Sequence, residues 1–490
     1  MKKIDKFLWY ITALITVCTS CSDFLNTGPT DRIPSDMVKT LADAKRVANG
    51  LYTRIKWEDY YGSTMLALGE LKADDIRNRT ETSGYTSIYQ YNHSTNVNNY
   101  GALWSRVYNV LLNANSLLSI VDNFSASSQG EIDQRNDIKG QALAVRGLCH
   151  FDLARAYGYP YQMDKGASLG AVLATEVIPQ GEARPRATVK ETYDVAIQSL
   201  SDALPLLSKA RNHGHFNFWA AKALLARVYL YMGDYDNAFK HADEIITTVG
   251  STYTLISNAQ YVASWASPNS SETMLEILVT IPSNLNSNYG VGLYFYGLTF
   301  EPGAMVGSYL VPTTSLRDLL NEDPDDVRNK LLRVAVTGDT WLRKFPGNSV
   351  NPPNYGLHNP LLIRLSEVYL IAAEAALMKT TRDQSKANQY LNAIRKRANP
   401  AAPDVTATVD EVLKERRKEL CAEGHRFFDL ARLGRTIDRS APDHVLPINN
   451  TYKVINPWNP QSFHCVVLPI SSSERNANPL ALQNPGYADN

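Results

Sequence analysis

The chain has 490 residues, of which 44% are hydrophobic, so it is long enough to bury a large core. Its 49 basic and 49 acidic residues balance, and a chain without a basic excess lacks the charge that nucleic-acid-binding proteins use. The length alone suggests two or three domains. Helical patterns nevertheless lie both before residue 245 and after residue 360, with irregular segments between them. This nesting predicts a single domain over residues 21–490.

The first twenty residues have the pattern of a secretory signal. A lysine-rich start precedes an apolar stretch over residues 7–17, which is too short to span a bilayer. Cys21 follows two small residues, as in the cleavage site of a bacterial lipoprotein. We expect residues 1–20 to be removed and Cys21 to carry lipid. Because Cys18 stands where leucine is usual in this motif, cleavage without lipid attachment remains the alternative.

Three further cysteines, Cys149, Cys421 and Cys465, lie in the remaining chain. Three cysteines cannot all pair, so a disulfide framework is not expected, and the prediction is that they are small buried apolar residues. Their spacing with histidine does not match a zinc site. The sequence therefore predicts neither a metal nor a cofactor.

A helical repeat is clearest over residues 219–248, where small and bulky apolar residues recur at helical spacing around a Gly-Asp break. This spacing is typical of tetratricopeptide repeats, which stack pairs of antiparallel helices. Weaker copies predict about four helix pairs. The expected fold is mostly α, with a helical scaffold over residues 38–56, 103–157, 189–248 and 362–434.

Long irregular segments separate these helices, at residues 57–100, 249–360 and 440–463. Loops of this length are usually functional or disordered, and their aromatic content argues against disorder. We expect them, with a few short strands such as one within residues 271–279, to form a ligand-binding face on the scaffold.

Two of these segments concentrate tyrosine and asparagine. Aromatic faces stack on sugar rings, and amides and carboxylates bond to paired hydroxyl groups. About half of the tyrosines are expected instead to pack the loops onto the scaffold. The candidate ligand-binding residues are Asp74, Arg77, Tyr89, Tyr91, Asn92, Trp265, Tyr294 and Tyr296.

No nucleophile elbow, metalloprotease motif, phosphate-binding loop or EF-hand pattern is present. Glu70, Asp74 and Asp75 offer the carboxyl groups that a divergent glycosidase would need, but solvated acids or ligand contacts are the preferred interpretation. The acidic run at residues 322–326 is interpreted as a solvated turn, because it lacks the spacing of a calcium loop. The sequence predicts a binding protein rather than an enzyme.

Residues 413–434 combine an apolar stripe with a dense set of charges. The stripe places Arg416, Glu419, Glu423, Arg426 and Asp429 beside a buried surface, where ion pairing is expected to fix the fold. His425, within this run, is expected to be buried, hydrogen-bonded and structural.

The same run, Glu-Arg-Arg-Lys-Glu-Leu at 415–420 followed by Glu-Gly-His-Arg-Phe-Phe-Asp-Leu at 423–430, resembles the C-terminal signature of the SusD/RagB family. Cys421 departs from it. Residues 146–157, 364–375, 468–470 and 478–487 resemble further blocks of this family. The resemblance implies a lipid-anchored protein of the outer membrane that faces the cell surface.

The resemblance further implies a non-catalytic protein that captures an oligosaccharide and delivers it to a SusC-like TonB-dependent transporter as a lid over its barrel. A peptide-binding lid of the RagB type is the first alternative. A tetratricopeptide scaffold without a small ligand is the second. In this family the glycan site lies in the regions before the tryptophan-containing helix and after the tetratricopeptide pair, which correspond here to residues 57–100 and 249–360.

Overall fold

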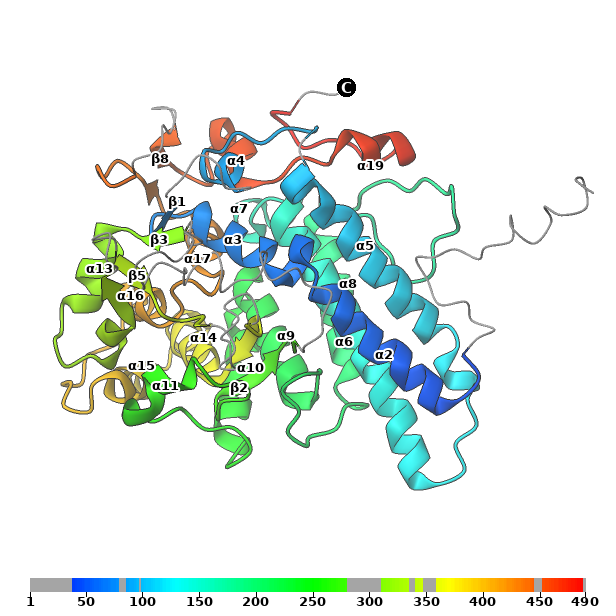
Figure 1. Ribbon diagram of the computed structural model, residues 1–490, viewed down its shortest axis with the longest axis horizontal. Helices are drawn as coiled ribbons and strands as arrows, with labels where there is room; N and C mark the ends of the chain where they lie inside the picture. The colour runs from blue at the N-terminus through cyan, green and yellow to red at the C-terminus, as the bar shows by residue number, and fades with distance from the viewer. Residues whose placement is uncertain are drawn as a thin grey trace, which may run out of the picture.

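The computed structural model describes residues 38–78, 85–96, 98–279, 310–334, 340–346, 358–444 and 452–487, and this part of the chain is mostly helical. Figure 1 shows α2, α5, α6 and α8 on one side of the molecule and α11, α13, α15 and α16 on the other. Helices α9, α10 and α14 lie between these two groups. The helical scaffold therefore runs through the whole molecule.

The long helices form consecutive pairs in chain order. The pairs are α2 (Leu41–Ile55) with α5 (Asn98–Leu118), α6 (Gln129–Tyr157) with α8 (Val189–Ala203), α9 (Phe218–Met232) with α10 (Tyr235–Thr248), and α14 (Leu365–Met378) with α15 (Gln384–Ala398). Successive pairs pack on one another through α5 and α6, α8 and α9, and α10 and α14. This confirms the predicted tetratricopeptide-like scaffold of four pairs.

Local sequence signals explain where these helices begin and end. Thr40, Ser128 and Thr188 each form a capping box with the acidic residue three positions later, which satisfies free backbone N–H groups in the first turn. Gly233 adopts a φ of 78° and ends α9, and Asp234 then caps α10. The Gly-Asp pair therefore makes the tight turn between two antiparallel helices.

Shorter elements complete the fold. The short helices are η2 (Glu58–Gly62), α3 (Thr64–Leu71), α4 (Thr86–Tyr89), η3 (Val121–Asn123), α7 (Tyr161–Asp164), η4 (Asn258–Gln260), α11 (Tyr261–Ser264), α13 (Thr314–Asn321), η5 (Val327–Leu331), α16 (Val409–Glu419), α17 (Arg426–Arg432), η7 (Pro460–Ser462), α18 (Phe463–Val466) and α19 (Ser472–Ala477).

The strands of the described residues form four two-stranded antiparallel ladders. These pair β1 (Ile76–Asn78) with β3 (Leu310–Pro312), β2 (Thr273–Glu276) with β6 (Leu361–Arg364), β4 (Leu332–Val334) with β5 (Thr340–Leu342), and β7 (Ile437–Asp438) with β8 (Val454–Ile455). The strand expected within residues 271–279 is therefore present as β2.

The region at residues 57–100 is less irregular than predicted. Every residue of α3 is buried, and η2 and α4 lie on either side of it in sequence. The segment Thr-Met-Leu-Ala-Leu-Gly-Glu-Leu is apolar all round, so it lacks the polar face that gives an exposed helix its periodic pattern. The prediction of a loop was wrong here for that reason.

Ion pairs among buried side chains join the C-terminal signature to the rest of the fold. Arg364 contacts Glu272 at 3.3 Å, Glu419 at 2.5 Å and Glu423 at 2.7 Å, and Arg397 bonds to Glu272 and Glu419. All five side chains are at most 4% exposed. The expectation that ion pairing fixes this region is confirmed.

The network continues around α16 and α17. Arg328 binds Asp326, Glu415 and Glu419, and Arg416 bonds to Asp429 at 2.9 Å. Asp326 is buried, and its neighbour Glu322 pairs with Lys414 and Lys418. The acidic run at residues 322–326 is therefore not simply a solvated turn, because Asp326 pairs with the buried Arg328 and Glu322 pairs with two lysines of α16.

The signature loop also packs directly on α3. Oε1 of the buried Glu70 accepts hydrogen bonds from the backbone N–H groups of Gly424 (2.8 Å) and His425 (3.2 Å). A Cβ atom on Gly69 would lie 2.0 Å from the carbonyl oxygen of Gly424, which itself has a φ of 81°. The two backbones therefore meet at a distance that only glycine at position 69 permits.

We expect Gly69→Ala to lower the free energy of unfolding by about 1–3 kcal/mol, because the added methyl group must displace backbone rather than a side chain. Urea denaturation followed by circular dichroism would measure this change. Gly50→Ala in α2 is the matched control, because nothing lies within 4 Å of its Cβ position. Equal stability of the two variants would contradict the close approach.

Candidate functional site

The β1–β3 ladder brings together the two regions that the sequence singled out for ligand binding. Asn78, at the end of β1, is the register partner of Leu310, at the start of β3. Residues 79–84 follow β1 in the chain, and residues 280–309 precede β3. The paired residues Asn78 and Leu310 therefore connect the two predicted binding regions at one end of this ladder. Tyr294 and Tyr296 belong to the second region and lie outside the described residues.

Tyr89 and Tyr91 do not present their ring faces to solvent. They are 0% and 3% exposed, and their hydroxyl groups contact His444 Nδ1 at 2.7 Å and the carbonyl oxygen of Lys72 at 2.6 Å. The guanidinium of Arg439 lies over both rings, 4.1 Å and 4.8 Å from their centroids. The prediction of an open aromatic platform is corrected for this pair, because the rings pack this segment onto the core.

The acidic candidates of this region have structural partners. Asp74 forms a two-point ion pair with Arg426, with both contacts at 2.8 Å, and Asp75 pairs with Arg417. Burial raises the pKa of Asp75, whereas the pKa of Asp74 is lowered by Arg426 and further by Arg417, against the effect of burial. These contacts leave neither carboxyl group in the position of an acid–base pair facing an open cleft.

Arg77 is half-buried in β1, and Asn92 is exposed after α4. In sequence, these two residues lie on either side of residues 79–84.

His425, expected to be structural, is buried as predicted. Its Nδ1 atom, however, has no hydrogen-bond partner in the described structure and lies 4.0 Å from Glu367, so the expected hydrogen bond is not present at that atom.

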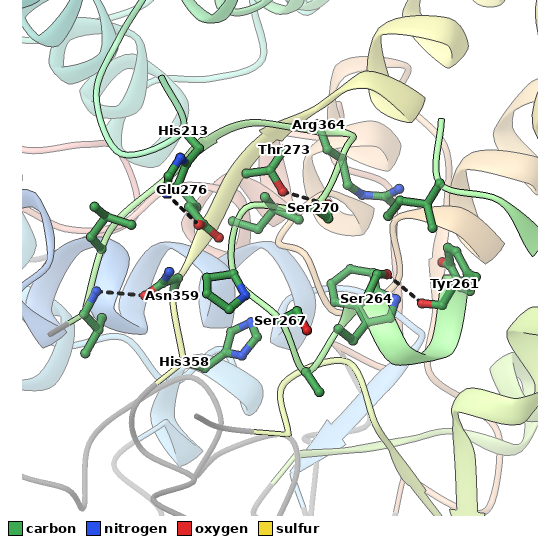
Figure 2. A pocket seen from close by; sticks show the side chains of 17 residues that line it. His213, Tyr261, Ser264, Ser267, Ser270, Thr273, Glu276, His358, Asn359 and Arg364 are labelled. Carbon is green, nitrogen blue, oxygen red and sulfur yellow. Dashed lines mark hydrogen bonds and ion pairs between the residues drawn. The ribbon is translucent and has the colours of Figure 1, made fainter. Parts of the chain in front are cut away.

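A pocket of about 260 Å³ lies elsewhere, beside the β2–β6 ladder. Its wall is built from α11 and the residues after it, from β2, from His213, and from residues 358–364. Figure 2 shows Ser264, Ser267, Ser270 and Thr273 around the cavity, with His213 and Glu276 on one side and Tyr261 on the other. The lining combines hydroxyl, imidazole and amide groups with apolar side chains, as small-molecule sites do.

Trp265 lines this pocket directly after α11. Its side chain is only 7% exposed, and its ring lies 4.7 Å from Lys344 Nζ and 5.7 Å from the Arg364 guanidinium. Its indole Nε1 and the hydroxyl oxygen of Tyr261 are buried without a hydrogen-bond partner in the described structure. Trp265 was predicted as a candidate ligand-binding residue, and its side chain lies in the wall of a concavity.

Glu276 closes one side of the pocket at the end of β2. Its Oε1 accepts a hydrogen bond from the backbone N–H of Asn269 at 2.9 Å and lies 3.8 Å from His213 Nε2. Burial raises the pKa of Glu276 to about 7 and lowers the pKa of His213, and it lowers the pKa of His358 to about 4. Both imidazoles are therefore neutral at pH 7.

Sequence reasoning did not find Glu276, His213, His358 or Asn359. These residues come from three separate segments that the β2–β6 pairing and the backbone bond from Glu276 N–H to the His213 carbonyl bring together. The only local signal was the serine-rich stretch around Trp265 before a short strand. It marks a turn, but it does not identify the partners across the cavity.

Two properties of the described structure bear on partners. None of its helices combines the length and apolar character needed to cross a membrane. No group of three or more histidine, cysteine or acidic side chains within it is arranged to hold a metal ion. Cys149, Cys421 and Cys465 are buried and unpaired, as predicted.

Comparison with known proteins finds the same architecture in the SusD superfamily. Residues 330–487 match the model of the SusD family, and residues 23–230 match a family described as starch-binding and associating with the outer membrane. A SusD superfamily structure from Bacteroides vulgatus is 37% identical, with a TM-score of 0.82, covering 92% of this chain and all of that one.

A second SusD superfamily structure, from Bacteroides thetaiotaomicron, is 35% identical with a TM-score of 0.84, covering 91% of this chain and all of that one. The starch-binding protein SusD of Bacteroides thetaiotaomicron is 25% identical in an alignment 341 positions long that covers 55% of this chain and 59% of SusD. The chain belongs to the SusD family. The resemblance seen in the C-terminal signature is thereby confirmed over nearly the whole length.

We expect the stability of the protein to fall as Glu70 ionises. Burial, with the nearby charge of Asp75, raises the pKa of Glu70 from 4.5 to about 8. A raised folded-state pKa stabilises the fold below the unfolded pKa, and this contribution is lost as the pH rises toward 8. Glu70→Gln should therefore gain stability relative to the parent between pH 4.5 and 8, as measured by urea denaturation.

Glu131 is the control, because its pKa is shifted in the opposite direction from that of Glu70. Backbone N–H groups of Ser127 and Ser128 lower its pKa, so Glu131→Gln should be no more stable than the parent at pH 7. Parallel stability curves for the parent and Glu70→Gln over this pH range would contradict the assignment of a buried carboxyl group that prefers its proton.

Proposed function

We propose that this protein is a non-catalytic, cell-surface lipoprotein that binds an oligosaccharide and delivers it to a partner SusC-like TonB-dependent transporter in the outer membrane. The observation that carries the proposal is the match of residues 23–230 to a family described as starch-binding and associating with the outer membrane. The starch-binding protein SusD, which is 25% identical over part of the chain, supports the same class of ligand.

The pocket beside Trp265 supports binding of a sugar ring. An aromatic ring, several hydroxyl groups and an amide line one cavity and offer both apolar contact and hydrogen bonds. Arg77 and Asn92 at the β1–β3 end, together with Tyr294 and Tyr296, are proposed as a second contact region for a longer oligosaccharide. Asp74 is proposed to support that region through its ion pair with Arg426.

The peptide-binding alternative is not favoured. The relatives described above are named for starch or for the SusD superfamily. The glycosidase alternative has no support from the acids of α3 and the residues after it, because Glu70, Asp74 and Asp75 each contact the C-terminal signature.

We expect Trp265→Ala to weaken oligosaccharide binding about tenfold, because it removes an aromatic surface from the cavity wall, which contributes about 1–2 kcal/mol. A glycan array followed by isothermal titration calorimetry on the positive ligands would measure the loss. Trp219→Ala is the matched control, since Trp219 is equally buried but its Nε1 donates to the Lys209 carbonyl oxygen.

Unchanged affinity of a folded Trp265→Ala variant would remove the pocket from the proposal. Failure of the parent protein to bind any neutral, acidic or host-derived glycan on the array would remove oligosaccharide capture itself.

The proposed anchor is Cys21, which lies outside the described residues. Two or more acyl chains hold a protein on a membrane far more firmly than one. Expression of Cys21→Ala should therefore move the protein from the membrane fraction to the soluble fraction and abolish labelling with radioactive palmitate. Cys149→Ala, which changes a buried cysteine, should leave both readouts unchanged. Palmitate incorporation that persists in Cys21→Ala would show that another residue carries the lipid.

A further inference from the structure

Glu276 is a buried carboxyl group in the pocket wall without a lysine or arginine ion-pair partner in the described structure. Its side chain is 6% exposed, and the nearest basic nitrogen recorded against it is the neutral His213 Nε2 at 3.8 Å. Burial raises the pKa of Glu276 more than hydrogen bonds from Asn269 and Asn359 and the charge of Arg211 together lower it, and the guanidinium of Arg211 is bonded to the carbonyl groups of Asn269 and Ser270. Above pH 7, where Glu276 is mostly ionised, its negative charge has no lysine or arginine paired with it in the described structure.

The other charged groups at the pocket do not offer a free positive charge. Arg364 contributes to the lining, but its guanidinium is shared among Glu272, Glu419 and Glu423. Lys344, next to the Trp265 ring, bonds to Glu423 at 2.6 Å and to the Glu419 carbonyl oxygen. His358 is neutral at pH 7, because burial lowers its pKa to about 4.

The remaining lining groups suit an uncharged sugar ring. Glu276 offers acceptor oxygen atoms to ligand hydroxyl groups, and the side chains of Ser267 and Asn359 add hydroxyl and amide groups to the same lining. A carboxylate or sulfate on the ligand would instead meet Glu276 across a desolvated cavity, where like charges repel strongly.

We propose that this pocket is a subsite for one uncharged sugar residue and that Glu276 makes the protein select against acidic sugars. This inference rests on the proposed function and adds to it the chemical class of the residue bound. Glu276 acts as a specificity-determining group, because it faces the bound ring and repels only those rings that carry an anion.

Calorimetry with matched ligands tests this inference. Maltohexaose, laminarihexaose and mannohexaose are each compared with the same oligosaccharide oxidised at C6 to the carboxylate. At about pH 8.5, where Glu276 with its pKa of about 7 is ionised, the parent protein should bind the neutral member of the recognised pair about tenfold or more tightly than the acidic member. Glu276→Gln, which keeps the size of the side chain and removes its charge, should reduce that ratio to about threefold or less.

Glu474→Gln is the matched control, because burial also raises the pKa of Glu474, a half-buried glutamate in α19. It should keep the ratio of the parent. If Glu276→Gln does not fold, the ratio of the parent at about 50 and about 500 mM NaCl replaces it, since salt should weaken an electrostatic preference.

Equal or tighter binding of the acidic member by the parent would overturn charge selection while leaving oligosaccharide capture intact. A ratio unchanged in folded Glu276→Gln would overturn the role of Glu276 alone. A parent protein that binds no neutral or acidic oligosaccharide would overturn the inference together with the proposed function.

Discussion

Arg364 lies where three glutamates from distant parts of the sequence meet. It ends β6, while Glu272 precedes β2, Glu419 ends α16 and Glu423 lies in the loop before α17. Removing charges from water costs several kcal/mol for each ion, and only close pairing with full hydrogen bonding offsets that cost. The segments must therefore be in place together, and the network favours a single arrangement of strand, helix and signature loop.

The pocket is built on this network. Arg364 belongs to both, and the ring of Trp265 packs against the cations of Arg364 and Lys344. Glu272, which binds Arg364 and Arg397, immediately precedes the strand that ends in Glu276. Ion pairs that fix the fold thus also fix the position of an aromatic ring and a carboxyl group across one cavity. The charged groups of this region therefore have two roles. Those in ion pairs hold the fold together, whereas the carboxyl group of Glu276, which has no lysine or arginine partner in the described structure, faces the cavity.

Local patterns in the sequence predicted the parts of the fold that depend on local interactions. The helix pairs were predicted from apolar spacing and from the Gly233-Asp234 break. Ion pairing in the C-terminal signature was predicted from the density of charged residues beside an apolar stripe. Helix α3 was not predicted from the sequence, because a helix buried on all sides lacks the polar face that gives a periodic pattern. The burial of Tyr89 and Tyr91 depends on Arg439, which lies almost 350 residues away in the chain.

The candidate site was predicted in part. Trp265 was singled out, but its partners across the pocket were not, because they are set by the long-range pairing of β2 with β6 and by the segment around His213. Such contacts leave no periodic trace in sequence. Tyr294, Tyr296 and Cys21 remain predictions.

A crystal structure of the protein with the oligosaccharide that it binds most tightly tests the central claim most directly. We expect one sugar ring in the pocket, in contact with the indole of Trp265 and with a hydroxyl group hydrogen-bonded to Glu276. An oligosaccharide bound elsewhere on the protein, with the Trp265 pocket containing only water, would contradict it.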